Sequence, residues 1–195
     1  PTVYTIVADP TKGTEPREHI GLVRIFADER NESGDASTSA LYSVKLDGTQ
    51  PRRLTYGLSN HLDPVVLRDG RVVYAAWQRA TPERGPQGRI ALVGVNPDGL
   101  DAAVFAADEG QRIKTMPCAT PTPDRLVVFV EADQVGWDGA GALAAVSLRR
   151  NLHSHRVIAA DGLYHSPAAL ANGAILAARR PTSGGSHGLV LVDTR

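Results

Sequence analysis

The stretch HLDPVVLRDGRVVYAAW, residues 61–77, contains two short apolar runs separated by an Asp-Gly pair. Asp-Gly between alternating apolar residues is a strong signal for a tight hairpin turn between antiparallel strands. The alternation in RVVYAAW, together with its β-branched and aromatic residues, favours strand over helix. The stretch therefore predicts two adjoining strands that meet at residues 69–70.

The same order of a proline, an apolar run, a turn and a second apolar run occurs three times, beginning near Pro64, Pro117 and Pro167. A second motif, Leu-x-x-Val, keeps the same rhythm, with steps of 51, 51 and 46 residues between its leucines at positions 41, 92, 143 and 189. Four short antiparallel strands that recur every ~40–50 residues are typical of a β-propeller blade. A β-sandwich would not explain such a period, so we predict an all-β propeller.

The repeat divides the chain into four blade units near residues 1–57, 58–108, 109–161 and 162–195, all within a single domain. The last unit stops after its third strand, and VYTIVA at residues 3–8 is the candidate innermost strand of the first unit. Two arrangements stay open. The N-terminal strand could close a four-bladed ring, or the chain could form part of a larger ring of about six to eight blades. We favour the second, because blade number in propellers is usually higher than four.

The composition excludes several classes of function. Lys plus Arg and Asp plus Glu each number 21, so the charge gives no indication of a nucleic-acid partner. The single cysteine, Cys118, excludes an internal disulfide and Cys-rich zinc modules. No run approaches the ~18 consecutive apolar residues of a membrane span. The first residues also lack the basic flank and long apolar core of a signal peptide.

Two segments resemble a known family. LYSVKLDGTQPRRLTYG, residues 41–57, and the stretch at 61–77 are similar to the TolB-type propeller repeat, and this similarity extends with decreasing fidelity to residue 195. The run from DPVVLRDG to NPDG, residues 63–99, also resembles the propeller region of hydrazine synthase alpha-subunit-like proteins. The resemblance implies a propeller fold and a periplasmic or extracellular location, although the composition does not exclude the cytoplasm. Haem chemistry in that family needs Cys-x-x-Cys-His, so a chain with one cysteine is not expected to bind haem.

The connections between the second and third strands of each unit are long and polar, at residues 28–40, 78–89, 131–141 and 179–188. In a propeller these connections share one face with the links between blades, whereas the turns on the opposite face are mostly tight. We call the first of these the loop face. Loops longer than a hairpin needs, repeated on one face, indicate a binding surface there.

Three polar residues precede the repeat proline by two or three positions: His61, Lys114 and His165. We expect them to ring the mouth of the central channel and, with Asp63, to form a ligand-binding site. His61 and His165 are the candidate ligands of a metal ion at this mouth. Two histidines without a third ligand are a weak metal signal, so polar residues that only line a wet channel are the alternative. No other cofactor is expected.

Trp137 lies in a glycine-rich loop, where it is either an exposed anchor for a partner or folded back on its own blade. GGSHG at residues 184–188 matches the nucleophile elbow of hydrolases, but the strand-like residues that follow Ser186 argue against that role. Cys118 is expected to be buried and inert. His153 and His155 are expected to lie in a solvated hairpin.

No pair of residues stands out as general acid and base, so we assign no catalysis to this chain alone. We expect a non-catalytic binding or scaffold module that presents the loop face to a protein or small ligand, with the remaining blades of a ring as further partners. One alternative is the propeller portion of a multidomain redox enzyme of the hydrazine synthase alpha-subunit-like type, with its catalytic centre outside this chain. A gating propeller attached to a peptidase is another.

Overall fold

A computed structural model describes residues 3–5, 20–26, 38–45, 47–79, 88–106 and 115–194. Over these residues every regular element is a β-strand, and all the strand pairs within the sheets are antiparallel. The described part of the chain contains no helical segment able to cross a bilayer. The all-β prediction is confirmed.

The first two blades are separate four-stranded sheets in which spatial order follows chain order. Blade 1 consists of β1 (Val3–Thr5), β2 (Ile20–Phe26), β3 (Ser39–Lys45) and β4 (Arg52–Arg53). Blade 2 consists of β5 (Asn60–Val66), β6 (Val72–Gln78), β7 (Arg89–Val95) and β8 (Ala103–Val104). Val3–Thr5 is the described part of the candidate strand at residues 3–8, and it pairs with β2 at the inner edge of blade 1, as predicted.

Blades 3 and 4 share one strand. Blade 3 contains β9 (Thr120–Pro121), β10 (Leu126–Glu131) and β11 (Gly141–Ser147), and blade 4 contains β13 (Ile175–Arg180) and β14 (Gly188–Val192). Between them runs β12 (Arg156–Ala169), whose first part pairs with β11 and whose last part pairs with β13. The outer strand of blade 3 therefore continues directly into the inner strand of blade 4, where the sequence suggested two separate strands.

The hairpin predicted at residues 69–70 is present, and its turn shows the local chemistry. The Gly70 N–H donates to the carbonyl of Leu67 at 3.0 Å, and the backbone N–H of Arg71 donates to the Asp69 carboxylate at 3.2 Å. Gly70 has a φ of +88°, a conformation that glycine adopts without steric cost. In blade 3 the equivalent turn position is Arg125, whose φ is +62°.

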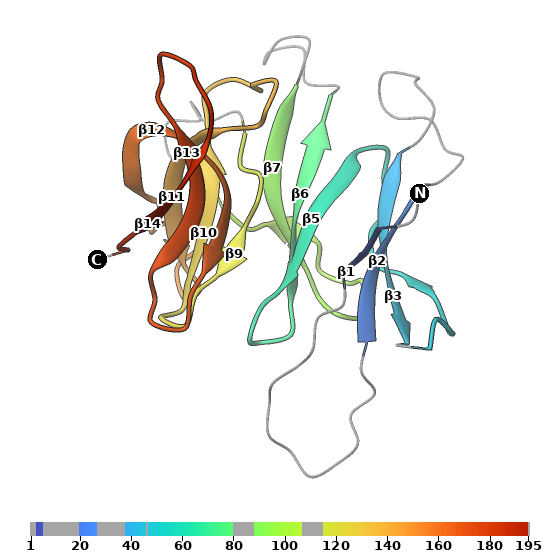
Figure 1. The fold of residues 1–195 in the computed structure, drawn as a ribbon. Helices are drawn as coiled ribbons and strands as arrows, with labels where there is room; N and C mark the ends of the chain where they lie inside the picture. Colours follow the sequence, from blue (N-terminus) through green and yellow to red (C-terminus); the bar gives the residue numbers. More distant parts are fainter. Residues whose placement is uncertain are drawn as a thin grey trace.

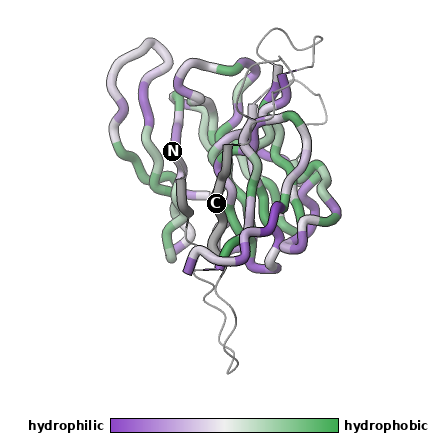
Figure 2. The backbone as a smooth tube through the Cα atoms, turned by 90° about the vertical axis from the view of Figure 1, so that its right-hand side faces the viewer, coloured by the Kyte–Doolittle hydropathy of each residue, from purple (hydrophilic) through white to green (hydrophobic). Residues whose placement is uncertain are grey.

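The core lies between the blades rather than within one layer. Val127 and Phe129 of β10 pack toward blade 2, and the alternate residues Val128 and Val130 pack toward blade 4. Successive side chains of a strand point to opposite faces, so a blade between two neighbours is apolar on both sides. Figure 2 shows hydrophobic stretches along the strands. The fully buried side chains at these interfaces include Leu41, Leu54, Val73, Leu92, Phe105, Leu143 and Ile175.

The blades follow one another along an open arc. The first strands of successive blades lie close together, with β5 near β9 and β9 near β12. Figure 1 shows blade 1 and blade 4 at opposite ends of the described arrangement. The fold is a partial β-propeller rather than a closed four-bladed ring.

Candidate functional site

The first strands of blades 2, 3 and 4 share a local distortion. Asp63, Cys118 and Ser166 have φ angles of +48°, +56° and +49°, and each lies four residues before the turn that follows. In β5 and β12 the strand pairing also shifts register at this point, which identifies a β-bulge. A left-handed backbone at a non-glycine residue costs on the order of 1–3 kcal/mol, and such residues concentrate at functional sites.

These residues from three blades come together at the inner side of the arc. The Cys118 thiol donates to the Asp63 carboxylate, with Sγ and Oδ2 3.7 Å apart, and His165 Nδ1 is hydrogen-bonded to the Ser166 hydroxyl. Burial, with the Asp63 charge as a second cause, raises the pKa of Cys118 to about 12, although a hydrogen bond from the Ser166 backbone opposes the shift. The thiol therefore stays protonated at neutral pH and is no nucleophile. We call Asp63, Cys118, His165 and Ser166 the axial cluster.

His61 lies elsewhere, inside the interface between blades 1 and 2. Its side chain packs edge-on against Tyr74 with ring centroids 4.9 Å apart, and the residue is 3% exposed. The Thr55 hydroxyl accepts from the Leu41 N–H and lies 2.8 Å from His61 Nδ1, to which it can donate. Burial, with the Arg53 charge as a second cause, lowers the pKa of His61 to about 4, so the ring is neutral.

The bulges explain why the two imidazoles differ. His61 lies two residues before the bulge residue Asp63, whereas His165 lies one residue before Ser166. A shift of one position on a strand sends the side chain to the opposite face. His61 therefore points into the core, whereas His165 joins the axial cluster.

Lys114, the third residue expected at the channel mouth, lies outside the described residues. Within the described ranges, no group of three or more His, Cys, Asp or Glu side chains is arranged to hold a metal ion.

Trp137 is 89% exposed at the tip of the loop between β10 and β11. The next residue, Asp138, is held firmly, because Arg180 Nε and Nη2 each lie 2.9 Å from its Oδ2 and the Ala140 N–H donates to its Oδ1. Although desolvation acts in the opposite direction, these contacts lower the pKa of Asp138. His187 Nε2 lies 4.0 Å from the same carboxylate. We call Trp137, Asp138, Arg180 and His187 the loop-face cluster.

The two clusters adjoin each other. Gly139 has a φ of +65°, and a Cβ placed on it would be 3.9 Å from His165 Nε2. The tip of the Trp137 loop therefore lies over the histidine of the axial cluster. The two clusters are therefore neighbours in the described part of the chain.

A partly buried pair that the sequence did not reveal links β10 to the residue that precedes β12. His155 Nε2 lies 2.5 Å from Glu131 Oε2, the Glu131 residue is 8% exposed, and the imidazole lies beside Phe129. The expectation of a solvated His155 is corrected, because its ring reaches across β11 to this carboxylate. Between two packed blades the pair is a structural contact, and nothing in it resembles a reactive pair open to a substrate.

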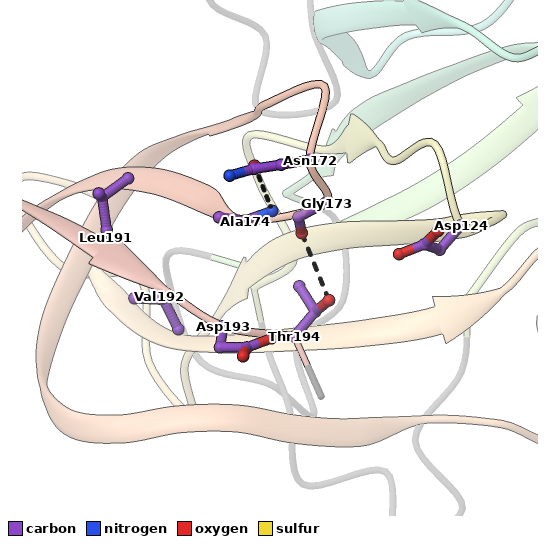
Figure 3. A pocket seen from close by; sticks show the side chains of 8 residues that line it. All are labelled: Asp124, Asn172, Gly173, Ala174, Leu191, Val192, Asp193 and Thr194. Atoms are coloured by element: carbon purple, nitrogen blue, oxygen red, sulfur yellow. Dashed lines mark hydrogen bonds between the residues drawn. The ribbon is translucent and has the colours of Figure 1, made fainter.

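A shallow pocket opens at the far end of the arc, lined by Asp124, Asn172, Gly173, Ala174, Leu191, Val192, Asp193 and Thr194. Figure 3 shows the side chains of Asp124 and Asp193 on different segments and Leu191 away from both. The lining provides carboxylates and the Thr194 hydroxyl, which donates to the Gly173 carbonyl at 3.4 Å, and it includes no histidine, lysine or cysteine. Ser186 is followed by strand β14, which removes the nucleophile-elbow interpretation.

No family model matches the chain. Hydrazine synthase subunit alpha from Kuenenia stuttgartiensis is 30% identical over 122 residues, which cover 59% of this chain and 15% of that protein. The chain thus spans a small part of the length of this curated relative. Among solved structures, Kuenenia stuttgartiensis hydrazine synthase has a TM-score of 0.69 at 22% identity, covering 88% of this chain and 26% of that one.

Two further solved structures share the fold. A puromycin-hydrolyzing peptidase from Mycobacterium tuberculosis has a TM-score of 0.64 at 15% identity over 97% of this chain and 29% of its own. A putative TolB from Agrobacterium tumefaciens has a TM-score of 0.53 at 16% identity over 71% of this chain and 44% of its own. The resemblance to TolB-like propellers and to hydrazine synthase alpha is confirmed, and these likenesses establish the fold.

Proposed function

We propose that this chain is a non-catalytic propeller module that binds a partner protein or a small ligand through the loop-face cluster. The observation that carries the proposal is the position of Trp137, which is 89% exposed on a loop anchored by the partly buried Asp138–Arg180 ion pair. An exposed tryptophan on a rigid base loses little conformational freedom on binding and contributes a large contact area. The adjoining axial cluster adds polar groups on the inner side of the same surface.

The chemistry of the described residues supports binding rather than catalysis. The Cys118 thiol is held protonated, His61 is enclosed in the core, and the Asp138 carboxylate is occupied by Arg180. None of these groups forms a base aimed at a free nucleophile. What the surface does offer is hydrogen-bonding groups beside an aromatic side chain, a common composition for an interface.

Site-specific photo-crosslinking in the source organism tests this function. A photoreactive phenylalanine analogue at Trp137 is expected to give discrete adducts, which mass spectrometry identifies. The matched control is the same analogue at Leu100, which is 62% exposed and lies in the turn between β7 and β8 of blade 2. Adducts of equal yield at both positions, or none at Trp137, would exclude the loop-face cluster as the binding surface.

A second role rests on the likeness to hydrazine synthase subunit alpha. In that role the same module is a scaffold within a larger, periplasmic or extracellular redox enzyme whose catalytic centre lies outside these residues. Sequencing the complete gene and assaying its product for covalently bound haem decide this point. A product without haem-attachment motifs and without a haem spectrum would exclude the scaffold role, and the binding role would then be the one proposed function.

A further inference from the structure

Blade 4 carries an apolar face that no described residue covers. Leu176 pairs with Leu191 and Ala178 pairs with Leu189 across β13 and β14, so these four side chains point to the same side of the sheet. Leu189 is 77% exposed and Leu191 is 67% exposed. We call these four residues the open face.

The repeat shows what such a face does elsewhere in the chain. The turns and the Leu-x-x-Val motif align the open face with Val128, Val130, Leu143 and Ala145 of blade 3. All four of these residues are 0% exposed, because Tyr164, Ile175 and Ala177 of blade 4 pack onto them. The equivalent Val73 and Leu92 of blade 2 are likewise fully buried against blade 3. The open face therefore matches an interblade surface, and no blade among the described residues packs on it.

The outer edge of β14 is open in the same way. In blades 1 and 2 the third strand is paired on its outer side, where Leu54 N–H donates to Leu41 O and Phe105 N–H donates to Leu92 O, each at 2.8 Å. By the Leu-x-x-Val alignment, Leu189 stands at the position of Leu41 and Leu92. Among the described strands none pairs with the outer edge of β14. Exposed apolar edges of this kind are rare in isolated domains because they invite pairing.

The shared strand β12 shows how one segment can provide both the outer strand of one blade and the inner strand of the next. Its first part pairs with β11 as the outer strand of blade 3, and the same strand then forms the inner strand of blade 4. A segment that pairs with β14 in this way would lead directly into the strand that begins the next blade.

We propose that the open face and the outer edge of β14 form one interface for a further propeller blade. The strand preceding that blade pairs with β14, and the sheet of the blade covers Leu189 and Leu191. This interface is separate from the loop-face cluster.

Thiol labelling at the open face tests the proposal. Leu191→Cys is compared in two proteins: the 195-residue chain alone and the product of the complete gene in its own cell extract. In the complete product the maleimide reaction at this position is expected to be at least about tenfold slower, as for a site that reacts only during local opening. Leu100→Cys, of similar exposure, is the matched control and is expected to react equally fast in both. Cys118 supplies the slow background.

Equal labelling rates of Leu191→Cys in the two proteins would overturn the proposal. Protection that appears in the 195-residue chain alone and grows with its concentration would also overturn it, because a second copy would then cover the face. Leu189→Cys repeats the test if Leu191→Cys does not fold. Trp137→Ala is expected to leave the labelling unchanged, so failure of the loop-face binding role is distinguishable from failure of this interface.

Discussion

The neutral, enclosed His61 makes a specific prediction about pH. Burial lowers its pKa from 6.5 to about 4, whereas in the unfolded chain the imidazole recovers its ordinary value. A difference of roughly 2.5 pKa units at 1.36 kcal/mol each corresponds to about 3 kcal/mol. Between these pKa values the unfolded chain binds more protons than the folded one. The contribution of His61 to the free energy of unfolding is therefore fully present above pH 6.5 and is lost as the pH falls toward about 4.

The assay is urea unfolding of the wild-type chain and of His61→Gln at several pH values between about 7 and about 4.5. The wild type is expected to lose about 2 kcal/mol more than His61→Gln over this interval, because glutamine does not titrate. The carboxylates and the other histidines are common to both proteins, so their contribution cancels in the difference. His153→Gln, at an exposed position, is the matched control and is expected to follow the wild type.

The absolute stability of His61→Gln at neutral pH does not decide the matter, because the substitution also alters packing against Tyr74. The difference between the two pH slopes decides it. Parallel pH curves for the wild type and His61→Gln would refute the inference that His61 is buried as the neutral base. An NMR titration of the imidazole with a midpoint near 6.5 would refute it independently.

Three further tests, which use five substitutions, probe the packing. Leu143→Ala is expected to lower the free energy of unfolding of the 195-residue chain by about 2–5 kcal/mol. The equivalent substitution in blade 4, Leu189→Ala, is expected to cost less than about 1 kcal/mol because the Leu189 side chain is exposed. Equal losses would contradict the open face. Gly141→Ala is expected to destabilise the chain by about 1–3 kcal/mol, since a Cβ there would lie 2.1 Å from the Glu131 carbonyl oxygen, and Gly188→Ala, with open space around it, is the control that should unfold like the wild type. Asp138→Ala is expected to cost about 2 kcal/mol by leaving Arg180 without its carboxylate, and an unchanged urea midpoint would show that the ion pair does not anchor the Trp137 loop.

The elements that could be predicted are those specified by local sequence. The Asp-Gly turn at residues 69–70 fixes the β5–β6 hairpin, and the spacing of Leu41, Leu92 and Leu143 fixes the repeat. Each of these signals is contained within one hairpin or one strand, so it is readable without knowing the neighbours. The continuity of β12 differs from the expected unit boundary between residues 161 and 162, because the structure runs a single strand through Asp161 and Gly162.

The site was less predictable, because its geometry depends on small shifts in register. The repeat prolines align His61 and His165 at similar positions, whereas the bulge residues Asp63 and Ser166 set them on opposite faces. A bulge has no strong sequence signature here, since Asp, Cys and Ser occupy the three positions. The axial cluster joins residues 55 and 48 positions apart, and only the packing of successive blades brings them together.

The strand shared by blades 3 and 4 bears on how this architecture can grow. Because β12 is both the outer strand of blade 3 and the inner strand of blade 4, cutting the chain between residues 161 and 162 would divide a single strand into two parts. The shortest stretch of sequence that could be duplicated without cutting a strand therefore does not coincide with one four-stranded blade, because its boundaries are displaced by one strand. Lengthening the arc by gene duplication preserves every existing strand only when the copied segment begins and ends in the loops that flank the shared strand.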